Sequence, residues 1–376
     1  MGTAAVVRTA AAGLAACLVA ACSPSAEPGW RQVGLPQGAG ASSLATSGPD
    51  LLVGGALGGA RPLLLRVDAT GGVHEVALSP SGGYAATADL VALSPQAPEL
   101  LALGVARGGA HGNQRWTSWQ GPLAGPVPDH DQPFATFGGH EAGPLLGIVR
   151  PGGRPVVVGS RAGTTGFDAA LWTLDGTLWH RHAGTDPQLV SSPDRVLTFR
   201  AAAASGDFVL IAGAETGLAG TVRQLPMVWA GSLDGAWRAI PLPVPEELSG
   251  ATGLAQATSL ACDAAACWAA GWARGRPVAW QLDLAAGAAR AFLLEGEGGS
   301  ATDPLAVVAL VDGIPAVLPD ARERLVAWRC GEGWRTAAGP PGRVAAAIGR
   351  GDRLYVVVGE DGAGTLWEGR LDTSAC

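Results

Sequence analysis

The chain has 376 residues and a net charge of −7 at pH 7, and its 25 basic residues are all arginine. A protein without lysine has no P-loop, no Schiff-base lysine and no lysine general base. The negative charge and the absence of a basic run also argue against nucleic-acid binding. Glycine (57 residues) and proline (27) are spread along the chain, and hydrophobic residues (48%) far outnumber charged ones (15%). This composition indicates many short strands joined by tight turns rather than a disordered polypeptide.

Residues 1–21 have the features of a secretion signal. Arg8 provides a positive charge, and the run from Thr9 to Ala21 contains only small and apolar residues. Its 13 residues are too few to span a bilayer, which takes about 20. The segment therefore predicts a signal peptide and export from the cytoplasm.

The signal ends in Val-Ala-Ala followed by Cys22, which resembles the lipobox of bacterial lipoproteins. This resemblance implies that Cys22 carries a diacylglycerol group. The alternative is an ordinary signal peptide cleaved nearby, with Cys22 left free. If Cys22 is lipidated, residues 22–28 form a tether of at most ~25 Å that anchors the protein to the outer face of the cytoplasmic membrane.

From residue 29 onward the sequence repeats. An apolar run that ends in glycine recurs every 40 to 58 residues, and proline replaces the glycine once. The run ends at Gly55, Gly104, Gly159, Gly213, Gly271, Pro319 and Gly359. An apolar pair and a tryptophan follow most of these runs, at Trp172, Trp229, Trp280, Trp328 and Trp367. Units of about 50 residues with four strands each predict the blades of a β-propeller, with the tryptophans packed between blades.

The seventh unit lacks a fourth strand at the C-terminal end of the chain. The missing strand is found near the other end, because residues 29–36 resemble residues 236–243, which close the fourth unit. Pairing of the N-terminal strand into the last blade would remove the exposed edges of an open ring. The sequence thus predicts an all-β, seven-bladed β-propeller over residues 29–376.

The whole pattern resembles extracytoplasmic propeller lipoproteins of the actinobacterial type. The resemblance covers residues 29–376 and implies a fold but no reaction. Asp175-Gly176 and Asp234-Gly235 look similar to the Asp boxes of sialidases, but both segments are too short and fit tight turns better. Neither kelch nor WD repeat signatures are present.

Four cysteines remain after residue 22. In an oxidising compartment, an even number predicts disulfides. Cys262 and Cys267 flank four residues between two apolar runs, which is the layout of a bridged hairpin, so Cys330 would pair with Cys376 by elimination. A zinc site is the alternative, but the spacing matches no common zinc pattern.

Several predicted second strands run into charged residues. These are Arg107, Arg161, Glu215, Arg274, Asp320 and Glu360, with Asp361 beside the last. In a propeller, the loops after the second strands share one rim with the connectors between blades. We therefore expect a mixed-charge mouth that binds a polar ligand or a peptide. The alternative is ordinary solvated loop charge.

Metal-binding residue types occur in the long loops of the second and third units: His111, Asp129, His130, Asp131, His140 and Glu141. Their spacing is irregular, so we expect exposed polar loops and neither a metal nor a cofactor. His180 and His182 alternate on one predicted strand face, so they are neighbours. We expect them to lie on a solvated face; a metal-binding pair is the alternative.

No catalytic triad signature appears, and the sequence predicts a binding or scaffold module rather than an enzyme. The expected partner is an extracytoplasmic protein or glycan, bound by a monomer. A carbohydrate-active hydrolase or lyase is the alternative. It would need two carboxylates facing each other across the central funnel at about 5–10 Å.

Overall fold

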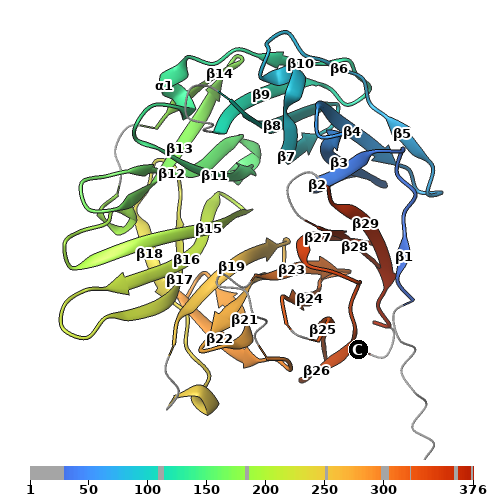
Figure 1. Cartoon of the computed structure of the whole chain (residues 1–376). Helices are drawn as coiled ribbons and strands as arrows, with labels where there is room; N and C mark the ends of the chain where they lie inside the picture. Colours follow the sequence, from blue (N-terminus) through green and yellow to red (C-terminus); the bar gives the residue numbers. More distant parts are fainter. Residues whose placement is uncertain are drawn as a thin grey trace, which may run out of the picture.

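The computed structural model describes residues 29–108, 114–182, 186–249, 253–297, 305–321, 323–359, 363–373 and 376. Seven small sheets stand around a central axis and form a seven-bladed β-propeller (Figure 1). The predicted signal peptide, the tether and Cys22 lie outside the described residues. Within these residues, no helix has the length and apolar character needed to cross a membrane.

Blades one to four follow one another along the chain. Blade one comprises β2 (Ala39–Ser47), β3 (Asp50–Leu57), β4 (Arg61–Val67) and β5 (Val73–Glu75), and blade two comprises β7 (Asp89–Gln96), β8 (Glu99–Arg107), β9 (Gln114–Pro122) and β10 (Val127–His130). Blade three comprises β11 (Ala142–Val149), β12 (Val156–Ala162), β13 (Phe167–Asp175) and β14 (Leu178–Arg181). Blade four comprises β15 (Arg195–Ser205), β16 (Phe208–Gly217), β17 (Arg223–Gly231) and β18 (Trp237–Pro241). Blade two has a fifth strand that was not predicted, β6 (Leu78–Ser79), which pairs in parallel with the edge of β10.

Blades five to seven complete the ring. Blade five comprises β19 (Ala255–Cys262), β20 (Cys267–Ala273), β21 (Arg276–Asp283) and β22 (Ala288–Leu293). Blade six comprises β23 (Ala306–Val311), β24 (Ile314–Pro319), β25 (Leu325–Cys330) and β26 (Gly333–Ala338). Blade seven comprises β27 (Val344–Arg350), β28 (Arg353–Val358), β29 (Thr365–Arg370) and β1 (Arg31–Gln32). Short helical turns lie in the connectors between blades: η1 (Ala85–Thr87), α1 (Phe134–Phe137), η3 (Pro187–Leu189) and η4 (Glu246–Leu248). Another, η2 (Pro151–Gly153), lies in the turn between β11 and β12 of blade three.

The strand order gives the ring two different rims. In every blade the first strand is innermost, and successive strands are antiparallel. The tight turns between strands one and two and between strands three and four therefore lie on one rim, which we call the turn rim. The loops between strands two and three and the connectors between blades lie on the other, which we call the loop rim.

The predicted closure is confirmed. β1 pairs antiparallel with β29, with Arg31 opposite Glu368, and forms the outer edge of blade seven. The Trp30 indole Nε1 donates a hydrogen bond to the Ala338 carbonyl oxygen of blade six at 2.8 Å. Val33 is buried in the cluster between blades seven and one. The segment thus joins three blades and covers the strand edge of β29.

The recurring glycines have a steric function. In blades one to five, the glycine of the second strand pairs with the residue just before a bulge in the first strand. A Cβ atom at Gly213 would overlap the carbonyl oxygen of Thr198, and one at Gly271 would overlap that of Gln256. Only glycine lets the bulged strand approach this closely. In blade six, where Pro319 replaces the glycine, β23 and β24 pair without a bulge.

The core is divided among the gaps between blades. The buried hydrophobic residues that the structure describes form seven clusters, one between each pair of neighbouring blades. The fully buried tryptophans Trp172, Trp229 and Trp280 each pack against the preceding blade, as the repeat predicts. Packing between the sheets rather than within them therefore holds the ring together.

Blade six departs from this pattern. Trp328 packs toward blade seven instead of blade five. The gap between blades five and six is filled by Trp268 and Trp334, whose rings meet edge to face at 5.9 Å between centroids. The position of Trp268, which does not fit the repeat, is thus explained by packing between blades.

Both predicted cysteine pairs are at bonding distance. Cys262 and Cys267 bridge the turn between β19 and β20, with sulfurs 2.05 Å apart. Cys330 at the end of β25 is linked to Cys376, with sulfurs 2.25 Å apart. The second bridge ties the end of the described chain to blade six, next to the closure of the ring.

Candidate functional site

The structure places the predicted charged residues on the loop rim, but it does not bring them together. Arg161 lies 3.1 Å from Glu141, and Glu215 lies 3.3 Å from Arg195. In both pairs, one residue stands at the start of the first strand and the other near the end of the second strand of the same blade. Each pair therefore clamps the open end of one inner hairpin.

Asp320 and Arg274 are also engaged in local contacts. The Asp320 carboxylate lies 3.1 Å from the Arg343 guanidinium, just before β27, so this pair joins blades six and seven. The Arg274 guanidinium donates to the carbonyl oxygens of Leu248 and Ser249 in the connector before blade five. Glu360 and Asp361 lie outside the described residues.

Arg107 differs from the others because it lines a cavity at the central mouth. This cavity has a volume of about 490 Å³ and is bordered by blades one, two and seven. Ser42 and Asp89 lie in its wall, where the Ser42 hydroxyl donates to the Asp89 carboxylate at 2.8 Å. Of the five predicted charges that the structure describes, Arg107 is the one best placed to meet a ligand in the funnel.

The Glu141–Arg161 ion pair changes the pKa of the glutamate. The hydrogen bond from Arg161 and its positive charge lower the pKa of the Glu141 carboxyl group, and the nearby His140 and Arg181 add to this effect. Three basic groups thus surround one carboxylate where blade three meets its connector.

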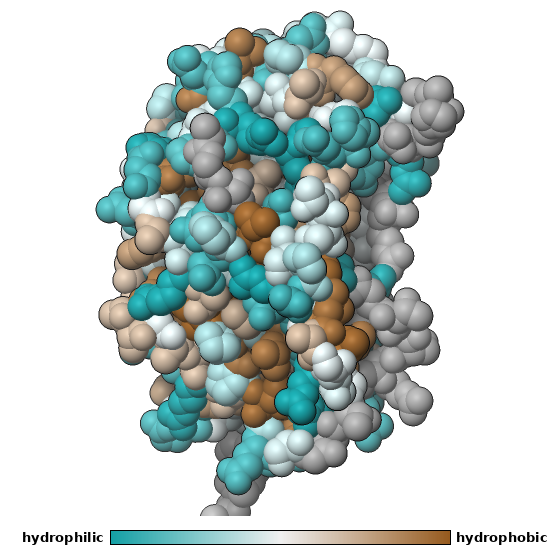
Figure 2. Space-filling view, turned by 90° about the vertical axis from the view of Figure 1, so that its left-hand side faces the viewer, coloured by the Kyte–Doolittle hydropathy of each residue, from teal (hydrophilic) through white to brown (hydrophobic). Residues whose placement is uncertain are grey.

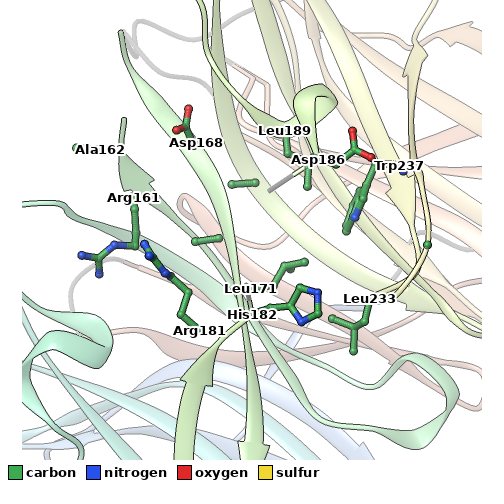
Figure 3. Close-up of a pocket in the computed structure, with 13 residues that line it drawn as sticks. Arg161, Ala162, Asp168, Leu171, Arg181, His182, Asp186, Leu189, Leu233 and Trp237 are labelled. Atoms are coloured by element: carbon green, nitrogen blue, oxygen red, sulfur yellow. Dashed lines mark hydrogen bonds between the residues drawn. The ribbon is translucent and has the colours of Figure 1, made fainter. Parts of the chain in front are cut away.

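A small cavity of about 120 Å³ lies beside this pair, between blades three and four. Figure 3 shows the guanidinium groups of Arg161 and Arg181 near each other, with the carboxylates of Asp168 and Asp186 set apart from them. Both carboxylates are used in structural contacts. Asp168 accepts a hydrogen bond from the Ser191 amide, and Asp186 accepts one from the Trp237 amide.

A second cavity of about 480 Å³ opens on the loop rim beside blade two. Its walls come from the connector before β7, from the start of β9 and from the connector that carries α1. Tyr84, Trp116 and Phe134 supply aromatic rings, and Arg115 and Asp129 supply opposite charges. The Arg115 guanidinium carbon lies 5.9 Å from the Tyr84 ring centroid and 5.5 Å from that of Phe134.

Exposed apolar side chains are concentrated on the same rim. Among the described residues, the large exposed hydrophobics on the loop rim are Tyr84, Phe134, Phe167, Leu218, Val222, Leu225 and Leu254, and those on the turn rim are Leu178 and Phe208. The side view of the ring at β11–β18 shows brown apolar patches interspersed with polar surface (Figure 2). The two rims therefore differ in apolar character although they are built from the same repeat.

The metal-binding residue types do not converge. In the described part of the chain, no three histidine, cysteine, aspartate or glutamate residues are close enough to hold a metal ion. A ring nitrogen of His130 lies 3.2 Å from the Gln120 carbonyl oxygen. His140 lies 3.7 Å from Glu141 and is exposed. His111 lies outside the described residues.

The sequence interpretation missed the aromatic cavity. Tyr84 and Phe134 stand in connectors that break the repeat, and Arg115 precedes the segment Trp116–Trp119, which takes the place of the apolar pair and tryptophan in its unit. The only signal in the sequence was the presence of aromatic residues in polar, proline-containing connectors. A connector is not part of the repeating core, so an aromatic residue there is a candidate for an exposed binding surface.

Sequence comparison does not classify the chain: no family model matches it, and no curated protein matches it. Its fold is similar to that of the solved structure "YCF48 bound to D1 peptide", with a TM-score of 0.52, 12% sequence identity, and coverage of 92% of this chain and 97% of that chain. It is also similar to a candidate 6-phosphogluconolactonase from Bacteroides uniformis, with a TM-score of 0.51, 12% identity, and coverage of 82% and 88%. At this identity the likeness shows the propeller fold alone.

Proposed function

We propose that the protein is a lipid-anchored, extracytoplasmic binding module whose loop rim binds a protein partner. The observation that carries this proposal is the concentration of exposed apolar side chains on the loop rim. Exposed apolar side chains that gather on one face of a protein are candidates for an interaction site, and aromatic residues and arginine dominate the energetics of interfaces.

A likeness in fold agrees with a binding role. The solved structure of YCF48 contains a bound peptide, so a chain of similar fold can serve as a peptide-binding platform. A hydrolase with its site in the funnel would need two carboxylates that face each other. Two acids near the ends of second strands, Glu215 and Asp320, are each paired with an arginine, which supports a structural role for them rather than a catalytic one.

The proposed anchor sets the orientation of the module. β1 runs from the turn rim toward the loop rim, so the tether of residues 22–28 would leave at the turn rim. A tether of at most ~25 Å keeps that rim near the bilayer. The loop rim would then face away from the membrane, where a partner can reach it.

Capture of partners from native membranes tests the proposal. Leu225→Ser on the loop rim is compared with Leu178→Ser on the turn rim, because the two side chains are similarly exposed, at 46% and 39%. We expect the loop-rim variant to lose most of the partner and the turn-rim variant to keep it. Equal capture by both variants would contradict the proposed face. Charge reversal of Arg161 or Arg274 probes the same rim less cleanly, since both arginines also hold the local structure.

The anchor is tested separately. Cys22→Ser should release the protein from the membrane without changing its melting temperature, because the tether is not part of the ring. A variant that stays membrane-bound would mean that the anchor is not a lipid on Cys22.

A further inference from the structure

The aromatic cavity beside blade two contains an arginine in an unusual setting. Arg115 begins the third strand of the blade, and its guanidinium lies within cation–π distance of both Tyr84 and Phe134. Phe134 is 64% exposed, and Tyr84 is exposed as well. Two solvent-exposed rings thus flank one half-buried cation at the mouth of the cavity.

Arg115 differs from other arginines on this rim. Arg161, Arg195 and Arg343 each lie beside a carboxylate. No ion pair between described residues includes Arg115, and its guanidinium donates a hydrogen bond to the neighbouring Gln114 carbonyl oxygen at 3.4 Å. A guanidinium within cation–π distance of two rings still has N–H groups that can bind a carboxylate in a bidentate manner.

We propose that this cavity binds a peptide through its carboxylate, with Arg115 as the anchor. The proposal deepens the proposed function, on which it relies for the peptide nature of the ligand. The volume of about 480 Å³ is within the range of small-ligand pockets and accommodates one or two residues.

Two acids in the wall of the same cavity favour a single orientation of the ligand. Asp129 is 8% exposed, and one of its oxygens accepts a hydrogen bond from the Ser81 amide at 2.5 Å. The other carboxylate oxygen of Asp129 and one carboxylate oxygen of Asp131 both lie near Gly82 in the cavity wall. These carboxylates can accept peptide N–H groups and repel a second carboxylate, so the ligand carboxylate must point toward Arg115.

The remaining walls supply aromatic surface. Trp116, Phe134 and Phe137 line the cavity together with Arg115. Aromatic rings pack on apolar side chains and also stack on sugar rings, so these walls suit both kinds of ligand. The choice of a peptide therefore rests on the proposed function, and an acidic sugar is the competing ligand to be tested.

Ligand-observed NMR titrations of the Cys22→Ser protein test this assignment. The probes are N-acetyl-phenylalanine, its C-terminal amide, the amide of N-acetyl-phenylalanyl-aspartate, and glucuronate. We expect the carboxylate of N-acetyl-phenylalanine to give at least tenfold tighter binding than the amide, as expected for a charge-assisted hydrogen bond. The aspartate probe carries only a side-chain carboxylate, so its affinity relative to N-acetyl-phenylalanine shows whether a C-terminus or an acidic side chain is preferred.

Variants assign the effect to the cavity. Arg115→Gln should remove the preference for the acid, and Arg115→Lys should restore only part of it. Arg290→Gln is the matched control, because Arg290 also lies over an aromatic ring, 5.0 Å from the centroid of Phe292, but in β22. The proposal is overturned by equal binding of acid and amide, by binding that ignores Arg115→Gln, or by glucuronate binding in place of both peptide acids.

The two proposals can fail independently. If the NMR probes depend on Arg115 while Leu225→Ser keeps the cellular partner, the cavity assignment stands and the rim proposal fails. If Leu225→Ser loses the partner while the probes do not bind, the rim proposal stands and the cavity assignment fails.

Discussion

At the scale of single residues, Gly213 illustrates how a sequence signature becomes a steric requirement. It pairs with Phe199 just before the bulge of β15, where a methyl group would meet the Thr198 carbonyl oxygen. We expect Gly213→Ala to lower the free energy of unfolding by about 2–3 kcal/mol, the usual cost of overpacking, as measured by urea denaturation.

Gly217 in the same strand is the matched control. Added atoms there meet only the Arg223 carbonyl oxygen, at 3.9 Å. Gly217→Ala should be neutral or slightly stabilising, since alanine loses less conformational entropy in a strand than glycine does. If both variants unfold at the same urea concentration, close approach is not the reason for the recurring glycine.

The Glu141–Arg161 pair gives a second prediction at this scale. Arg161 lowers the pKa of the Glu141 carboxyl in the folded protein. The pair therefore contributes stability above the unfolded pKa of about 4.3 and loses it as the pH falls through the lower folded value. Arg161→Gln should raise the Glu141 pKa toward its ordinary value, as followed by NMR titration. An unchanged pKa would mean that the ion pair does not persist in solution.

At the scale of elements, β1 is short but holds three blades. Trp30 bonds to blade six, Arg31 pairs with Glu368 of blade seven at 2.8 Å, and Val33 packs between blades seven and one. Deletion of residues 29–36 removes several buried apolar side chains and bares a strand edge. We expect a loss of about 5 kcal/mol in a single cooperative transition. Calorimetry that shows the intact melting temperature would refute the closure as a stabilising element.

The disulfide between Cys330 and Cys376 supports the same closure. It closes a loop with a sequence separation of 46 residues, whereas the bridge between Cys262 and Cys267 spans 5. On the chain-entropy model, replacing the long-loop pair with serine should cost about 4 kcal/mol and replacing the short-loop pair about 2. The order of the two losses in urea denaturation is the test, and the reverse order would contradict the model.

The predictable parts of the fold were those with a local signature. The glycine-ended runs and the tryptophans mark second and third strands in sequence order, and the strand missing from the last unit revealed the closure. Blade six shows the limit of this reasoning. Trp328 has the right sequence context but packs toward the opposite neighbour, since its orientation depends on the register of the whole sheet.

At the scale of the whole molecule, the repeat fixes a ring but not what its rims bind. Arg161, Glu215 and Asp320 lie on the loop rim as predicted. Each of them forms an ion pair with a residue from another part of the chain, so its charge is already partnered. The aromatic cavity depends on how two connectors, residues 80–88 and 131–141, pass over blade two. Connectors carry no periodic pattern, so their paths could not be derived from the sequence.

The central claim is that the loop rim, and not the turn rim, is the binding face. Site-specific photo-crosslinking in the native cell tests this claim most directly. Phe167 on the loop rim and Phe208 on the turn rim offer a matched pair, because both are phenylalanines, 44% and 46% exposed. A photoreactive phenylalanine analogue at position 167 should crosslink a partner protein, and the same analogue at position 208 should not. A partner crosslinked from position 208 and not from position 167 would contradict the account.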